Sequence, residues 1–543
     1  MNQPVTPANP SATPGFKRRI GLFTATMLVA GNMIGSGIFI VSADMARDVG
    51  GAGWLLMLWL LTGVMTVLGG LCYAELAGAL PHAGGQYLFL KEAFSPLWGF
   101  LYGWSAFTVI QCGSIAAVAV AFTKFLGVLF PTLGTGAEAV LVQVPMLVNI
   151  PLQLPWMPEH VTLFEREYFT ITMGQLIAAG VIMLLTFINC LGVASGALVQ
   201  NIFTVAKLFA LGLVIVMGLG VALDWVVVRQ NLQGAWDQAL DTEHMRRTVM
   251  LTDLTPALAF FLVAGGAMVG SLFSADAWAN VTLTAGEVKN PERNMPRSLV
   301  LGTCMVIGLY MLCNLAYLAV LPVQGDATLA ADLKKQAADN PAQTSAIYQG
   351  KASELGISQA QDDRVGTAVM GVASPGWGRV VMALGIMIST FGCVNGMILV
   401  TARLYYAMAK DGLFFRVAGT LNQRGVPQAS LIMQACWSIA LVFSGTYSEL
   451  LDYVIFASLL FYALTVAGLI LLRSRRPDLP RPFRVPGYPY VPILYGSLCL
   501  TMMFTLLVVR PEYTWPGLIL VALGVPVYYI WRLFPGRATG SIP

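Results

Sequence analysis

The chain has 543 residues, of which 57% are hydrophobic and only 11% are charged. With a mean hydropathy of +0.72, this composition excludes a soluble globular domain of the same size. The formal net charge is only +4 and is spread over the segments between apolar runs, which excludes nucleic acid as a partner. Apolar runs of about 20 residues recur along the chain, and each can cross a hydrocarbon core about 30 Å thick. The sequence therefore predicts an all-α polytopic protein embedded in a lipid membrane.

The amino-terminal end is polar. Residues 1–15 read MNQPVTPANPSATPG, and three basic residues at positions 17–19 precede the first long apolar run. Because no small-residue cleavage site follows a short apolar region, we expect no cleaved signal peptide. We interpret residues 1–19 as a cytoplasmic tail.

Twelve apolar stretches bounded by charge, proline or glycine are predicted to span the membrane. They lie near residues 20–46, 53–80, 96–126, 171–190, 196–221, 256–285, 298–320, 377–401, 428–445, 449–472, 489–509 and 514–533. We group residues 20–221 as a first set of five spans and residues 256–472 as a second set. Residues 489–533 supply two further spans, and residues 534–543 form a second cytoplasmic tail.

Basic residues predict the orientation. With the amino terminus inside, the short outer turns carry only Arg47 and Arg510. The short cytoplasmic connections carry Lys289, Arg293, Arg297, Arg403, Lys410, Arg416, Arg424, Arg473, Arg475, Arg476, Arg481 and Arg484. Outer loops near 127–170, 222–255 and 321–376 also hold basic residues, but long loops cross largely regardless of charge. Both termini are therefore predicted to be cytoplasmic, in an inner or plasma cell membrane.

Two spans contain interruptions that helix propensity does not favour. The first span carries GNMIGSGIF at residues 31–39, where each glycine costs about 1 kcal/mol relative to alanine in a helix. The sixth carries FSADAW at residues 273–278, which places an acid near mid-span. Paired broken helices at matching positions of two halves indicate an inverted-repeat transporter whose site lies at the midplane. The alternative for the glycines is close helix packing.

The titratable residues do not indicate catalysis. All eight cysteines fall within or at the edges of apolar segments, where they are typical packing residues. The three histidines have no second ligand at metal spacing. Without a clustered His/Asp/Glu set or a nucleophile elbow, we expect no cofactor, no metal and no enzymatic activity.

Five segments resemble a known family when they are taken in order. They are GNMIGSGIF in the first span, YAELAGALPHAGGQYLFLKEAF after the second, GEVKNPERNMPRSL after the sixth, FGCVNGMILVTARLYYAMAKDG closing the eighth and PFRVPGYPYVP before the eleventh. The chain is similar to the amino acid-polyamine-organocation permeases, and among them to the L-type amino acid transporters. The resemblance implies a LeuT-type five-plus-five inverted repeat, with helices one and six discontinuous and with two appended spans.

The resemblance also implies where a substrate binds. Backbone N–H groups freed in the segment Ile34, Gly35, Ser36 and Gly37 are expected to bind a substrate carboxylate at the positive end of a half-helix. The implied substrate is a small molecule, an amino acid, held without a buried protein charge at its carboxylate.

The sixth span is expected to supply the other half of the site. Carbonyls freed at Ser274 and Ala275 can receive the substrate ammonium. Phe273 resembles the aromatic residue that closes over substrate in this family, although packing in the core is the alternative. The family usually has an aromatic residue and glycines where this chain has SADA, so Ala275 and Ala277 predict a differently shaped cavity.

Asp276 is the sharpest polar feature, because an acid at membrane depth is costly and normally faces a cavity or a partner. It can cap the second half-helix, recognise the substrate, or couple protons. Some relatives that accept cationic amino acids carry an acid at this position.

Two further residues are candidates for coupling or gating. Lys207, in VQNIFTVAKLFAL, either extends to the cytoplasmic surface or, as the resemblance implies, takes the place of a sodium ion in sodium-coupled relatives. Asn395, in FGCVNG, either contacts substrate or forms a structural bond between helices.

The leading hypothesis is a sodium-independent secondary transporter of neutral or cationic amino acids, working by exchange or by proton symport. The alternatives are an amino acid sensor that keeps the fold, or a polyamine transporter. Animal L-type carriers bond a glycoprotein partner through a cysteine between spans three and four, and residues 127–170 contain none. We therefore expect no disulfide-linked heavy chain.

Overall fold

The computed structural model describes residues 18, 20–151, 162–237, 255–339, 347–348, 350–444 and 447–533. In this part of the chain, ten helices are long and apolar enough to cross a membrane. Two shorter apolar helices, α1 (Leu22–Met33) and α18 (Gln428–Val442), supply the first and ninth predicted spans. The polytopic helical fold is thus confirmed. Apart from Arg18, the predicted tails 1–19 and 534–543 lie outside the described residues, and the division into domains stays a prediction.

The first half of the chain contains most of the short irregular elements. Its elements are α1 (Leu22–Met33), η1 (Gly37–Phe39), α2 (Val41–Val49), α3 (Ala52–Ala79), α4 (Gln86–Ala93), α5 (Pro96–Ser105), the π-helical turn η2 (Ala106–Ile110), α6 (Gln111–Leu129), η3 (Pro131–Leu133), η4 (Ala137–Ala139), β1 (Val140–Pro151), β2 (Thr162–Thr172), α7 (Met173–Cys190), α8 (Val193–Val216), the π-helical turn η5 (Met217–Val221) and α9 (Trp225–Gln233).

The regular elements in the described residues of the second half are all helices. Its elements are α11 (Pro256–Ser274), η6 (Trp278–Glu287), α12 (Pro291–Val320), α13 (Ala327–Asp339), α15 (Ala352–Leu355), η8 (Gln361–Asp363), α16 (Val365–Ala373), α17 (Gly378–Lys410), η9 (Arg416–Gly419), α18 (Gln428–Val442), α19 (Tyr447–Arg475), α20 (Tyr490–Val509) and α21 (Pro511–Leu533).

Both predicted interruptions are confirmed. The first span ends as α1 at Met33 and resumes at Gly37 as the short 3-10 helix η1, followed by α2. The sixth ends as α11 at Ser274 and resumes as η6, a 3-10 helix that begins at Trp278. Between α11 and η6, Ala277 has a φ of 64°, a left-handed conformation that glycine adopts freely but alanine does not.

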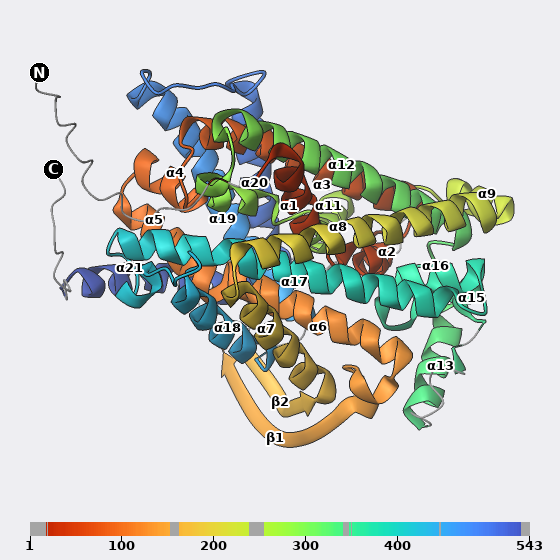
Figure 1. Ribbon diagram of the computed structural model, residues 1–543. Helices are drawn as coiled ribbons and strands as arrows, with labels where there is room; N and C mark the ends of the chain where they lie inside the picture. Colours follow the sequence, from red (N-terminus) through yellow and green to blue (C-terminus); the bar gives the residue numbers. More distant parts are fainter. Residues whose placement is uncertain are drawn as a thin grey trace, which may run out of the picture.

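The two broken helices lie at the centre of the bundle. Helix α1 contacts α8, α12, α17 and η6, and α11 contacts α2, α3 and α19 (Figure 1). At one end of the molecule α4 and α5 gather, and at the opposite end α13, α15 and α16 gather (Figure 1). The segment predicted as an outer loop over 321–376 therefore lies opposite the predicted cytoplasmic end, and it contains helices that the sequence analysis did not anticipate.

A β-hairpin occupies part of the outer loop predicted over 127–170. Strands β1 and β2 pair antiparallel, with Gln143 opposite Thr170 and Val144 opposite Phe169. The run VLVQV is rich in β-branched residues, which favours a strand over a helix. The hairpin contacts α7 and α21 through β2. It was missed because the apolar runs alone indicated only helices.

Candidate functional site

The carbonyls freed where α1 ends are bound by side chains from other helices. The ammonium of Lys207, on α8, is fully buried and donates to Gly31 O at 2.7 Å and to Ile34 O at 2.8 Å. Cys393 Sγ donates to Asn32 O at 3.1 Å. Lys207 has no ion-pair partner among the described residues, so backbone oxygens are the groups that compensate its charge.

Two hydroxyl groups from other helices also bind carbonyls of the first break. Ser389 Oγ, on α17, donates to Gly35 O at 3.1 Å. The Tyr310 hydroxyl, on α12, lies 3.1 Å from Met33 O and 3.0 Å from Ser274 O. Tyr310 therefore joins the first break to the second. Sequence reasoning missed Ser389 and Tyr310, because nothing in their local sequence marks a partner that is hundreds of residues away.

The N–H groups of the same segment are in a different situation. Ile34 N donates to Ala30 O at 2.9 Å, as the last amide of α1. Among the described residues, the N–H groups of Gly35 and Gly37 have no hydrogen-bond acceptor. Ser36 lies between them and is buried. The first break thus has bound carbonyls and donors that remain available, which is an arrangement suited to an anionic oxygen.

The two breaks lie against each other. A Cβ added at Gly37 would collide with the side chain of Ser274, whose hydroxyl donates to Gly270 O at 2.8 Å. Ala275 N bonds Ser271 O at 3.0 Å, which closes α11. The structure therefore brings together the Ile34–Gly37 segment and Ser274, as the sequence predicts. Phe273, at the end of α11, is buried.

Asp276 faces the aromatic side chain of a different helix. The Tyr462 hydroxyl, on α19, donates to Asp276 Oδ1 at 2.5 Å. The Tyr462 ring stacks on Trp278 with a centroid distance of 5.4 Å, and Tyr73 meets Trp278 edge-on at 4.9 Å. The cavity beside this carboxylate has a volume of only about 20 Å³, roughly the space of one water. In this conformation the cavity is too small to hold an amino acid beside Asp276.

The hydrogen bonds of Asn395 among the described residues go to α7 and α8, and not to either break. Its Oδ1 accepts from Asn189 Nδ2 at 2.9 Å, and its Nδ2 donates to Gly196 O at 3.2 Å. These bonds join α17 to α7 and α8. In this conformation the geometry is that of the structural alternative, and a role for Asn395 in gating stays a prediction.

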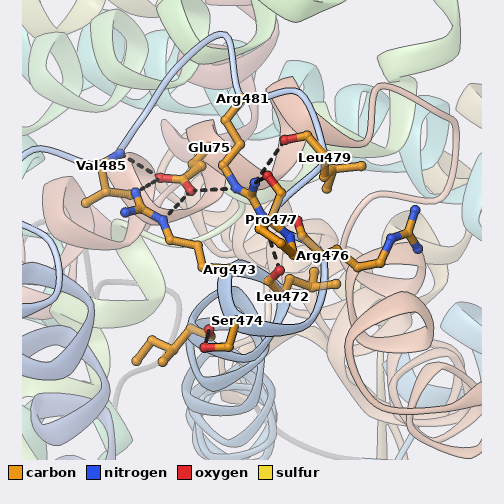
Figure 2. Close-up of polar contacts among 10 residues, drawn as sticks. Glu75, Leu472, Arg473, Ser474, Arg476, Pro477, Leu479, Arg481 and Val485 are labelled. Carbon is orange, nitrogen blue, oxygen red and sulfur yellow. Dashed lines mark hydrogen bonds and ion pairs between the residues drawn. The ribbon is translucent and has the colours of Figure 1, made fainter.

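A buried ionic cluster lies at the end of the bundle that is predicted to be cytoplasmic (Figure 2). Glu75, at the end of α3, accepts from Arg473 Nε at 2.7 Å and from Arg473 Nη2 at 2.5 Å. It also accepts from Val485 N at 2.7 Å, and Arg481 Nε lies 3.5 Å from it. Together these contacts fix α19 and the segment that follows it to α3. At the same end, Arg403 pairs with Glu287 at 2.6 Å.

A model of the amino acid permease family matches residues 20–529 of the chain. The chain belongs to this family. This match, together with the relatives described next, confirms its membership of the amino acid-polyamine-organocation superfamily, among L-type-like permeases.

Curated relatives agree with the family. The permease is 30% identical over 516 residues to the large neutral amino acids transporter small subunit 2 of Rattus norvegicus, which covers 95% of this chain and 80% of that protein. It is 27% identical over 518 residues to the b(0,+)-type amino acid transporter 1 of Mus musculus, covering 95% of this chain and 88% of that protein. It is 28% identical over 525 residues to the Asc-type amino acid transporter 1 of Mus musculus, covering 96% and 82%. These relatives are amino acid transporters, which supports amino acid transport as the activity of this multi-pass membrane protein.

Proposed function

We propose that this permease is a sodium-independent secondary transporter of neutral and cationic amino acids, working by alternating access as an exchanger or a proton symporter. The observation that carries the proposal is the pair of available N–H groups at Gly35 and Gly37, in a segment whose carbonyls are already bound. A carboxylate that enters this segment meets donors and no competing acceptor. Every amino acid substrate carries that carboxylate, whatever its side chain.

Sodium independence is supported by Lys207. A sodium ion that held the break open would need backbone oxygens as ligands, and two of these, Gly31 O and Ile34 O, already receive the buried ammonium. The ammonium of Lys207 therefore supplies, at these carbonyls, the positive charge that a bound sodium ion would otherwise supply. Replacing external sodium by choline is expected to leave the initial uptake rate nearly unchanged.

Asp276 supports a preference among substrates. A carboxylate in a low-dielectric cavity attracts a cationic side chain and repels an acidic one. Glutamate and aspartate should therefore be poor substrates. The aromatic rings of Tyr462, Trp278 and Tyr73 beside Asp276 would also favour a cation.

The test is uptake into proteoliposomes. Each of the 20 amino acids is supplied outside, with the same amino acid inside or absent, at two pH values and with sodium or choline. Uptake that requires internal substrate identifies exchange, and uptake that follows an inward proton gradient identifies symport. A steep dependence on sodium, or rapid uptake of glutamate, contradicts the proposal.

Asp276→Asn separates the roles of the acid. The asparagine keeps the shape and can still accept from Tyr462, but it removes the charge. If the charge selects substrate, the variant should lose cationic substrates far more than neutral ones. If the charge couples protons, the dependence of uptake on pH should flatten. Unchanged substrate and pH profiles would leave Asp276 with only a structural role.

A further inference from the structure

An open groove with a volume of about 890 Å³ runs between α7 and α18, away from both broken helices. Its α7 wall is formed by Met183, Thr186, Phe187 and Cys190, whose spacing of three, four and seven residues places them on one face of the helix. Its α18 wall includes Ile432, Ala435, Cys436 and Ile439, together with Gln428 at the start of the helix. Apart from the end at which α7 stops and α18 starts, the lining is almost entirely apolar.

The polar end of the groove carries one positive charge and no acid. Asn422, Gln423, Arg424 and Gln428 line it, and Arg424 is exposed. One guanidinium nitrogen of Arg424 donates to Leu191 O at 3.0 Å, just beyond the end of α7. The other guanidinium N–H groups of Arg424 have no partner among the described residues. The groove thus ends in a cation at the membrane boundary.

The length of the groove matches one leaflet. From Gln428 to Ile439 the α18 wall is about 16 Å long at 1.5 Å per residue, and half of a hydrocarbon core is about 15 Å. One polar group lies between the cation and the apolar depth: Thr186 is only 6% exposed, and its hydroxyl has no hydrogen-bond partner among the described residues. Thr186 lies roughly 6 Å along α7 from Cys190, which is deeper in the membrane than a headgroup bound at Arg424.

We propose that this groove is a binding site for one anionic glycerophospholipid, taken from the leaflet that Arg424 borders. The guanidinium of Arg424 binds the phosphate, the Thr186 hydroxyl donates to an ester oxygen, and an acyl chain lies between Phe187 and Ile432. Basic side chains between transmembrane helices at a membrane boundary are suited to such headgroups. The inference does not rest on the transport function.

Native mass spectrometry of the full-length chain provides the test. The protein is reconstituted with mixtures of phosphatidylglycerol and phosphatidylcholine, re-extracted in mild detergent, and the lipids that stay bound are counted. We expect one phosphatidylglycerol per chain, held in preference to phosphatidylcholine. Arg424→Gln should weaken retention about fivefold, the worth of one basic residue at an anionic surface. Arg484→Gln, which removes an exposed arginine outside the groove, is the matched control and should change nothing.

A second pair of variants tests the apolar part without altering charge. Cys436 is exposed within the groove, and Cys304 is exposed on α12. Cys436→Trp should fill the groove and lower retention, whereas Cys304→Trp should not. Equal retention of both lipids, or equal effects of the two arginine variants, would overturn the proposal. So would disulfide cross-linking of two chains through Cys436 in the membrane, because a second copy would then occupy the groove.

Discussion

Gly35 and Gly37 are two residues apart, yet the space available for an added side chain differs between the two positions. A Cβ at Gly35 would make ordinary contacts, 3.5 Å from Cys393 Sγ and 3.9 Å from Val118. A Cβ at Gly37 would overlap the side chain of Ser274. The close approach of the two breaks therefore depends on glycine at position 37 more than at position 35.

Gly37→Ala is expected to abolish uptake, because it forces the two breaks apart. Gly35→Ala should fold normally and keep measurable uptake, with a weaker affinity for substrate. Initial rates in proteoliposomes measure both, and size-exclusion profiles in detergent control for folding. Normal uptake by a well-folded Gly37→Ala variant would show that the breaks do not need this contact during transport.

Ala277 holds a left-handed backbone conformation in the second break, at a cost of about 1–2 kcal/mol for a residue with a Cβ. Ala277→Gly removes that strain but makes the unfolded chain more flexible, which costs about 0.4–1 kcal/mol. We expect its thermal stability in detergent to be equal to that of the parent chain or slightly higher.

The matched control for this substitution is Ala275→Gly. Ala275 has a φ of −93°, which alanine adopts without strain, so the change brings only the entropic cost. It should lower the melting temperature. A similar fall for Ala277→Gly would contradict the strain at that position.

At the scale of elements, Lys207 links α8 to the end of α1 with a charge that has no carboxylate beside it. Lys207→Met keeps the length of the side chain but leaves the carbonyls of Gly31 and Ile34 without their donor. We expect uptake to fall to background and the free energy of unfolding to fall by about 3 kcal/mol, since hydrogen bonds from charged groups are worth about 1.5–3 kcal/mol.

Ser389→Ala provides the comparison for Lys207→Met. It removes a neutral donor from Gly35 O in the same segment, so its cost should be about 1 kcal/mol and much of the uptake should remain. Uptake assays and thermal unfolding distinguish the two variants. If both lose uptake equally, the charge of Lys207 has no special part in holding the break.

The Glu75 cluster joins α3 to α19 and to the segment before α20 (Figure 2). The Glu75 side chain is 1% exposed and those of its two arginine partners are 18% and 9% exposed. Glu75→Gln leaves two largely buried guanidinium groups without a counter-charge, and breaking such a pair costs about 3 kcal/mol. We expect a clear loss of thermal stability. Asp478→Asn, which removes an exposed acid 3.9 Å from Arg476, should have almost no effect.

At the scale of the whole molecule, the sequence predicts the features that depend on the composition of a short stretch of chain. Apolar length gives the spans, and the runs at 31–39 and 273–278 give both breaks. The partners of those breaks are not local: Tyr310 is 277 residues from Met33, and Ser389 is 354 residues from Gly35. The hairpin β1–β2 and the helices α13, α15 and α16 were also missed. Strand β1 and helix α16 are apolar but shorter than a membrane span, and α13 and α15 lie in a largely polar segment, so a search for apolar spans indicates none of them.

The native residue Cys393 can serve as a chemical reporter of the opening of the first break. The thiol is buried and is held against Asn32 O, in the wall of the first break. A thiolate reacts with alkylating reagents only when water and reagent reach it. Cys304 and Cys436 are exposed and would react as well, so the modification of Cys393 is followed by peptide mass spectrometry. The rate at which a small soluble reagent, added on one side, modifies Cys393 then measures how often the break opens to that side, without any introduced cysteine.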